Sequence, residues 1–136
     1  MPRFAPEITD YLDQFRRGDT DNAFHGLLEL DRDVLPELMA DARTEPDIRI
    51  REFLVGVIWQ YRDPSVIPFL GDMLSDSEPR MWQQALNGLV TLASPASLEV
   101  LRAARTRSFP TPQASEEFRR WLEEAIEQAA TGAPKA

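Results

Sequence analysis

Apolar residues recur at intervals of three and four along the whole chain, and no stretch alternates at the period of two that a half-buried strand requires. This spacing places the apolar side chains on one face of successive amphipathic helices. Pro, Gly, Asp and Ser residues punctuate the pattern and mark helix starts and stops. The sequence therefore predicts an all-α chain of eight helices, which start near Pro6, Thr20, Asp33, Pro46, Pro64, Pro79, Pro95 and Ser115.

The predicted helices repeat in pairs. Residues 34–38 (VLPEL) align with residues 66–70 (VIPFL) at an offset of 32, and the same offset aligns Gly56 with Gly88. Gly26 precedes Gly56 by 30 residues, so one glycine position recurs in three successive pairs. A glycine inside a helix costs about 1 kcal/mol relative to alanine. Its recurrence at one place predicts close approach of a neighbouring helix.

A fourth pair fits at an offset of 36, with extra residues around 109–113. The four pairs cover about 6–31, 33–61, 63–93 and 94–130. We expect them to form one domain over residues 1–131, followed by a flexible tail of mainly small residues, 132–136.

The residues that link the paired helices carry a family resemblance. Residues 62–70 (RDPSVIPFL) and 75–80 (SDSEPR) form an Asp-Pro turn, a short apolar helix with an early Pro, and an Asp-rich turn before a second helix. This pattern resembles the HEAT-repeat family, and more closely the bacterial HEAT-like repeats of bilin lyases. The resemblance implies a right-handed α-solenoid of about four helix pairs. Tetratricopeptide repeats are the alternative, but their small and aromatic positions cannot be placed in this sequence.

Composition restricts the chemistry that is available. The chain has no Cys and a single histidine, His25, so disulfides, thiol nucleophiles and multi-histidine metal sites are excluded. The formal net charge of −8 argues against binding to nucleic acid or anionic membranes. The longest apolar run, residues 53–59, is too short to span a bilayer, and the N-terminal residues do not form a targeting segment. Every cation except Lys135 is Arg, as in proteins of GC-rich bacteria, and we expect a bacterial, cytoplasmic protein.

The resemblance implies that the second helix of each pair lines the concave side of the stack. The positions opposite each apolar stripe are therefore the predicted partner-binding residues. We expect them to line one groove with an apolar, aromatic centre and an acidic rim, with Trp59 as the anchor; the alternative is that Ile48, Val55 and Trp59 pack inside the stack. The predicted residues are Asn22, His25 and Glu29; Ile48, Glu52, Val55 and Trp59; Arg80, Gln84, Asn87 and Thr91; and Glu116, Arg120, Glu123 and Glu127.

Other chemically suggestive residues have simpler interpretations. His25 and Glu29 are one helical turn apart, but no nucleophile or second histidine accompanies them. The Asp-x-Asp pairs at 19–21 and 31–33 resemble fragments of calcium loops but lack the remaining ligands, so they are interpreted as cap and turn residues. Trp82 and Trp121 lie on apolar stripes and are predicted to be buried.

We therefore expect a monomeric, non-enzymatic protein-binding module that needs no cofactor or metal. Its acidic charge favours a basic protein partner, and small acidic HEAT-like proteins resemble immunity proteins that inhibit basic nuclease toxins. Within the same class, a general adaptor function is also compatible with the sequence. The alternatives are an accessory protein that acts on a cofactor-bearing protein, as the bilin lyases do, and a DNA-binding protein similar to the HEAT-like DNA glycosylases. The acidic groove disfavours the last.

Overall fold

The structure, a computed structural model, describes residues 6–132. Within these residues it contains eight α-helices, three short 3₁₀ helices and no strand. The predicted all-α fold is therefore confirmed. The chain divides between Tyr61 and Arg62 into two compact units, here named unit 1 and unit 2, which are described separately.

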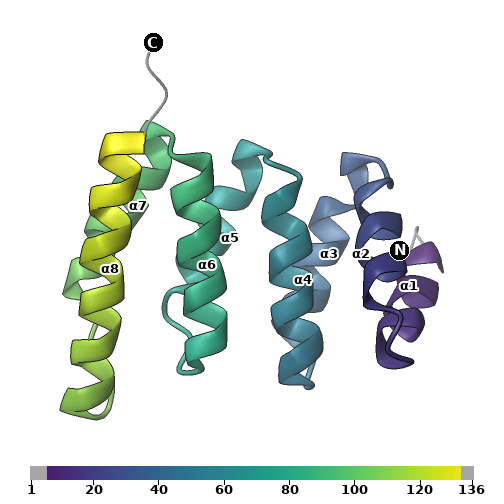
Figure 1. Cartoon of the computed structure of the whole chain (residues 1–136), viewed down its shortest axis with the longest axis horizontal. Helices are drawn as coiled ribbons and strands as arrows, with labels where there is room; N and C mark the ends of the chain where they lie inside the picture. Colours follow the sequence, from purple (N-terminus) through teal and green to yellow (C-terminus); the bar gives the residue numbers. More distant parts are fainter. Residues whose placement is uncertain (1–5, 133–136) are drawn as a thin grey trace. The chain divides into compact units, whose positions relative to one another are not determined.

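Unit 1 consists of two antiparallel helix pairs (Figure 1). The helices α1 and α2 pack on each other, as do α3 and α4, and α4 also contacts α2. Fully buried aliphatic side chains such as Leu27, Leu38, Leu54 and Ile58 form the core. The helices are α1 (Pro6–Arg16), α2 (Thr20–Leu28), the 3₁₀ helix η1 (Arg32–Val34), α3 (Leu35–Thr44) and α4 (Ile48–Gln60).

The contact between α1 and α2 explains one of the recurring glycines. Gly26 is buried, and a Cβ atom at this position would overlap the ring of Tyr11 in α1. The predicted close approach of a neighbouring helix is therefore confirmed at Gly26. For Gly56, which is half-buried, and Gly88, which is buried, it stays a prediction.

Side chains from α4 and the residue that follows it join the two pairs of unit 1. Phe53 stacks on Phe15 of α1, with ring centroids 4.2 Å apart, and lies edge-on to Phe24 of α2. The hydroxyl of Tyr61 donates to the carbonyl oxygen of Leu27 and lies 3.1 Å from that of Leu30. Tyr61 therefore adds a side-chain hydrogen bond to the carbonyl groups near the C-terminal end of α2 and ties this end to the residue that follows α4.

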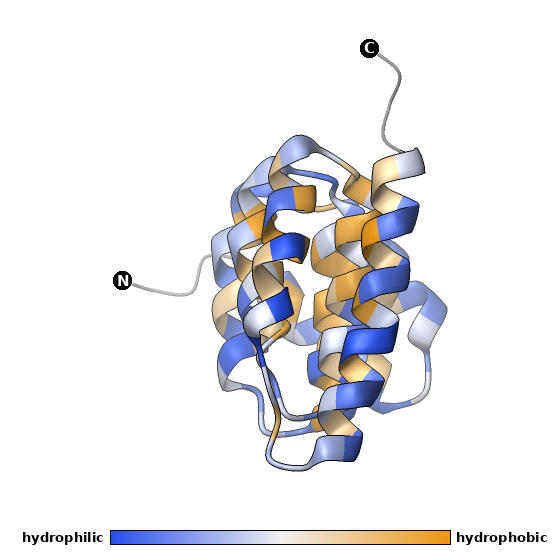
Figure 2. Ribbon diagram, turned by 90° about the vertical axis from the view of Figure 1, so that its left-hand side faces the viewer, coloured by the Kyte–Doolittle hydropathy of each residue, from blue (hydrophilic) through white to orange (hydrophobic). Residues whose placement is uncertain are grey.

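Unit 2 also consists of two helix pairs, and α6 packs against α5, α7 and α8. In Figure 2 the apolar residues of its helices lie mainly on the sides that face one another. Its core includes Phe69, Leu70, Leu89 and Phe118. The helices are the 3₁₀ helix η2 (Pro64–Val66), α5 (Ile67–Met73), α6 (Pro79–Leu92), α7 (Pro95–Ala103), the 3₁₀ helix η3 (Ala104–Thr106) and α8 (Pro112–Gly132).

The 32-residue offset found in the sequence is also a structural repeat. Asp31 and Asp63 each accept a hydrogen bond of 2.9 Å from the backbone N–H two residues later, and each starts a 3₁₀ turn that leads into an α-helix. The sequence predicted Asp33 to be the N-cap of the third helix, and this prediction was wrong. The extra 3₁₀ turn shifts the α-helical start to Leu35.

The eighth helix also starts earlier than predicted. It begins at Pro112, whose missing N–H is tolerated in a first turn, and the hydroxyl of Thr111 accepts from the N–H of Ala114 at 3.1 Å. Ser115, the predicted cap, lies inside the helix, and its hydroxyl accepts from the N–H of Phe109 at 2.7 Å. Ser115 thus fixes the preceding loop instead of capping the helix.

The predicted domain limits are compatible with this organisation but are not tested by it. The division at Tyr61 falls between the predicted pairs 33–61 and 63–93. That all four pairs form one domain over residues 1–131, and that the stack is right-handed, stay predictions. Of the predicted tail, 132–136, all but Gly132 lies outside the described residues.

Candidate functional site

In unit 1 the predicted residues of α2 are accessible. Asn22, His25 and Glu29 are exposed, and together with Tyr11 and Gln14 of α1 they line an open hollow of about 240 Å³. Asn22 donates a 3.0 Å hydrogen bond to the carboxylate of Asp19. The hollow is shallow and polar, and the histidine in it stands without a second imidazole.

The predicted line on α4 is only partly accessible. Val55 is completely buried, so its assignment to an exposed groove was wrong. Ile48, Glu52 and Trp59 are half-buried. The physical reason is that α4 packs on both α3 and α2, and a helix with two neighbours buries residues on two sides of its wheel.

In unit 2 the predicted residues of α6 reach solvent. Arg80, Asn87 and Thr91 are exposed, and Gln84 is half-buried. Of these four residues, only Asn87 is among those that line the groove between α6 and α8.

The predicted residues of α8 are exposed but lie outside this groove. Glu116 and Arg120 line a separate hollow near the start of α8, and Glu127 is exposed beyond it. Glu123 makes a two-pronged ion pair with Arg105 of η3, at 2.8 and 2.9 Å. This hydrogen bonding lowers the pKa of the Glu123 carboxyl and raises that of the Arg105 guanidinium. Glu123 is therefore directed to η3 and not to α6.

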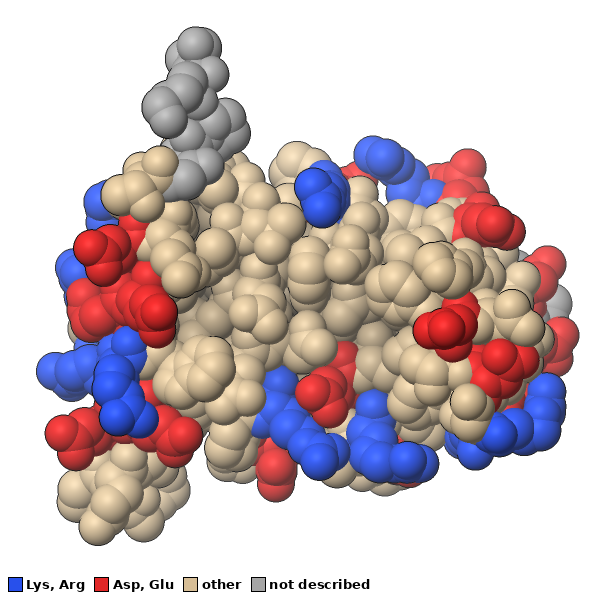
Figure 3. All heavy atoms as spheres, viewed as in Figure 1, with Lys and Arg blue, Asp and Glu red and all other residues tan. Residues whose placement is uncertain are grey.

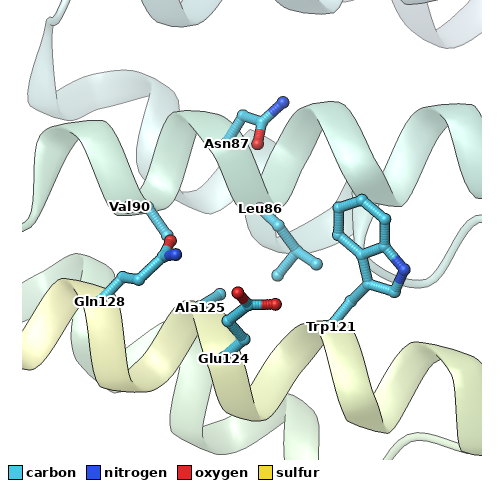
Figure 4. A pocket seen from close by; sticks show the side chains of 7 residues that line it. All are labelled: Leu86, Asn87, Val90, Trp121, Glu124, Ala125 and Gln128. Carbon is cyan, nitrogen blue, oxygen red and sulfur yellow. The ribbon is translucent and has the colours of Figure 1, made fainter.

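A groove of about 280 Å³ lies between α6 and α8 (Figure 4). Its walls combine apolar and polar side chains, and in Figure 4 Trp121 and Glu124 project from α8 toward α6, where Leu86 lies between the helices. Gln128 extends toward Val90. The groove is lined by Leu86, Asn87 and Val90 of α6 and by Trp121, Glu124, Ala125 and Gln128 of α8.

Trp121 corrects a second prediction. It was expected in the core, but 39% of its surface is exposed, which makes it the one large exposed hydrophobic residue of the described chain. At about 100° per residue, Trp121 lies some 60° from Phe118, at the edge of the apolar stripe beside Glu124 and Gln128. That edge position was the signal in the sequence that could have identified it.

An aromatic cluster holds Trp121 in place. Its ring centroid is 6.0 Å from that of Trp82, and the rings are nearly perpendicular at 75°. Trp82 is buried and also meets Phe118 edge-on at 5.2 Å. Phe109 from the preceding loop lies 5.1 Å from Phe118. The exposed indole therefore stands on a packed base, which limits the conformational entropy that binding would cost.

Charge is unevenly distributed on the face of unit 2 that carries α6 and α8. In Figure 3 the surface over α6 and the adjoining side of α8 is mainly uncharged, whereas acidic and basic side chains gather on the outer, left-hand side of α8. The groove thus lies on an uncharged strip bordered by charge. Within it, Glu124 is the only charged lining residue.

The described residues offer neither a metal site nor a membrane-spanning helix. Among residues 6–132 no group of three or more His, Cys, Asp or Glu side chains could hold a metal ion. None of the helices in this part of the chain combines the length and the apolar character that a membrane span requires.

Paired helices that recur with a common offset define a helical-repeat protein of the α-solenoid class. The sequence matches HEAT repeats over residues 35–127, about two thirds of the chain, and the protein belongs to the HEAT-repeat family. Repeats of this family generally mediate protein–protein interactions and are typically non-catalytic scaffolds. No curated protein and no solved structure matches the chain significantly.

Proposed function

We propose that this protein is a non-enzymatic binding module for a basic protein partner, and that the groove between α6 and α8 is a principal contact surface. The observation that carries the proposal is Trp121, a large aromatic side chain held exposed on a packed base where it lines the groove between α6 and α8. Exposed aromatic anchors of this kind dominate the energetics of protein interfaces.

The dimensions of the groove favour a protein partner over a small molecule. Its volume of about 280 Å³ is at the lower end of the range for ligand pockets, and it is open to solvent along its length. Such a groove accommodates one or two side chains of a partner. A bilin or another large cofactor would not be enclosed, so the lyase-type alternative gains no support from it.

Charge supports the choice of a basic partner. The whole chain carries −8, and α8 presents exposed acidic residues outside the groove. A negative field accelerates encounter with a positive protein and repels nucleic acid. Within this proposal, an immunity-type inhibitor of a basic nuclease toxin is the specific form that fits an acidic protein, and a general adaptor is the broader form.

The predicted partner-binding residues of α2, in unit 1, form a second proposed contact surface. Asn22, His25 and Glu29 line a polar hollow and are free to contact a partner that also covers unit 1. Trp59 is half-buried, which makes it a less exposed anchor than Trp121.

Photo-crosslinking in the source organism tests the proposal. A benzoylphenylalanine replaces Asn87, which lines the groove, and in a matched control it replaces Glu99, an exposed residue of α7. We expect one dominant protein to be crosslinked from position 87 and not from position 99, and we expect this protein to have a basic isoelectric point. Binding of the purified partner, measured by calorimetry, should weaken in Trp121→Ala.

Several results would contradict the proposal. Equal crosslinking from both positions would indicate chance encounters. An acidic partner captured at position 87 would contradict the charge argument. A partner that binds Trp121→Ala as tightly as the wild type would place the interface elsewhere.

A further inference from the structure

Two adjacent carboxylates of α8 have different environments. Glu123 is paired with Arg105 through two hydrogen bonds. Within the described residues, the carboxylate of Glu124 has neither an ion pair nor a hydrogen bond, and it is exposed where it lines the groove between α6 and α8. An exposed carboxylate without a partner is free to pair, through charge-assisted hydrogen bonds, with a cation delivered by another molecule.

The neighbouring aromatic ring suits the same ligand. Trp121 precedes Glu124 by three residues, so the two side chains lie on one face of the helix, and Figure 4 shows both directed toward α6. Among the described residues Trp82 is the one aromatic ring in contact with this indole, and 39% of Trp121 is exposed. An indole face attracts a cation more strongly than the other aromatic side chains do.

We propose that the α6/α8 groove binds an arginine side chain of the partner protein, with the guanidinium stacked on Trp121 and paired with Glu124. This inference rests on the proposed function and specifies the chemistry of its contact. The planar guanidinium stacks on an aromatic ring and forms a two-pronged pair with a carboxylate, which a lysine ammonium cannot do.

The remaining lining residues complete the site. Leu86, Val90 and Ala125 form an apolar floor that suits the methylene stem of an arginine. The side-chain amides of Asn87 and Gln128 have no hydrogen-bond partner among the described residues, and their carbonyl oxygens can accept from the guanidinium N–H groups that Glu124 leaves free. No Lys or Arg of the described chain lines the groove, so the site is not occupied by a cation of its own.

A peptide titration followed by NMR tests this assignment on the full-length chain. The probe is the capped pentapeptide acetyl-Gly-Ala-Arg-Ala-Gly-amide, and its matched controls carry citrulline or lysine in place of arginine. Citrulline has the shape of arginine without the charge. The three tryptophans give three indole N–H signals, and Trp121→Phe identifies that of Trp121.

We expect the arginine peptide to shift the Trp121 indole signal and the backbone amides of Asn87 and Gln128 in a saturable way. Citrulline should cause no saturable shift, and lysine should bind more weakly. Glu124→Gln should weaken arginine binding about tenfold or more, since it removes a charge-assisted hydrogen-bonded pair. Glu127→Gln makes the same charge change on the same helix outside the groove, and binding should stay within about twofold. Thermal melts confirm that both variants are folded.

Three results would overturn the inference. They are an equal response to the citrulline or lysine peptide, unchanged affinity in Glu124→Gln, and the absence of saturable shifts at about tens of millimolar peptide. Failure here is distinguishable from failure of the proposed function. A basic protein crosslinked from position 87 together with a silent peptide titration would keep the binding function and reject the arginine contact.

Discussion

The indoles of Trp82 and Trp121 meet at 6.0 Å in a nearly perpendicular pair, yet Trp82 is 2% exposed and Trp121 is 39% exposed. One ring belongs to the core of unit 2, and the other extends from the core to solvent. Because the two rings differ so much in burial, truncation of Trp82 and truncation of Trp121 should change the free energy of unfolding by different amounts.

Trp82→Ala should destabilise the protein by about 3–5 kcal/mol, because it removes a buried ring that contacts Phe109, Phe118 and Trp121. Trp121→Ala should cost clearly less, since its ring is already partly hydrated. Urea denaturation followed by circular dichroism measures both. Equal losses would mean that Trp121 is a structural residue and would remove the main argument for the groove.

Truncation of the repeat's inward leucines tests the register. Leu54 and Leu86 occupy equivalent positions in successive pairs, and both are buried. Leu54→Ala and Leu86→Ala should each cost about 2–5 kcal/mol of unfolding free energy. Thr91→Ala, an exposed change on α6, should stay within about 0.5 kcal/mol of the wild type and serves as the control.

Tyr61 should give a specific dependence on alkaline pH. Burial and, to a smaller extent, the nearby Asp31 raise the pKa of its hydroxyl from 10 to about 12. Because the folded state holds this proton more tightly, its contribution to stability is fully present below about pH 10 and is lost as pH rises through about 12. The ultraviolet difference titration between the wild type and Tyr61→Phe should have its midpoint near the upper value.

Tyr61→Phe itself should destabilise unit 1. It removes the hydroxyl that reaches the carbonyl oxygens of Leu27 and Leu30 near the end of α2. The expected loss is that of one hydrogen bond, about 0.5–1.5 kcal/mol, because the Leu27 carbonyl still accepts from the N–H of Leu30. The stability difference between the two proteins should shrink as pH approaches 12. A difference that is constant between pH 8 and this value would contradict the assigned hydrogen bonds.

The close contact of Gly26 with Tyr11 predicts non-additive mutations. Gly26→Ala alone should destabilise by about 1–2 kcal/mol, because displacement of the Tyr11 ring outweighs the gain in helix propensity. In a Tyr11→Ala background the same change should stabilise by up to about 1 kcal/mol. A double-mutant cycle on unfolding free energies measures this reversal, and additive effects would exclude the steric explanation.

Local features of the fold could be predicted from the sequence, because the helical period and most caps depend on neighbouring residues. Ser94 caps α7, as its place before Pro95 predicts, whereas Asp63 caps the 3₁₀ helix η2 and not α5. The starts of α3, α5 and α8 were misplaced by two or three residues, since 3₁₀ turns and a first-turn Pro follow the same local signals as an α-helical start.

The exposed surface was harder to predict, for a different physical reason. A helical wheel places a residue relative to its own helix but does not say which neighbour covers that side. Val55 lies opposite the apolar stripe of α4 and is nonetheless buried, whereas Trp121 lies on the edge of a stripe and is exposed. Glu123 was predicted to line the groove, but its side chain is directed toward Arg105, a contact between distant parts of the chain that a helical wheel does not show.

The ion pair of Glu123 sharpens the last prediction, which concerns the rate of association with the partner. Glu116 and Glu127 are exposed acidic residues of α8 outside the groove. Reversing both to Lys should slow association up to about tenfold at low salt and flatten its salt dependence, because charges beside an interface act mainly through long-range steering. Dissociation should change little.

The matched control is Arg105→Gln combined with Glu123→Gln, which removes a positive and a negative charge together and keeps the net charge of −8. Stopped-flow binding over a range of ionic strengths should show an unchanged association rate for this control. If the control slows association as much as the double reversal does, then the Arg105–Glu123 pair lies inside the interface and the partner covers the η3 side of α8. If neither variant changes the rate, electrostatic attraction does not guide the partner and its basic character is rejected.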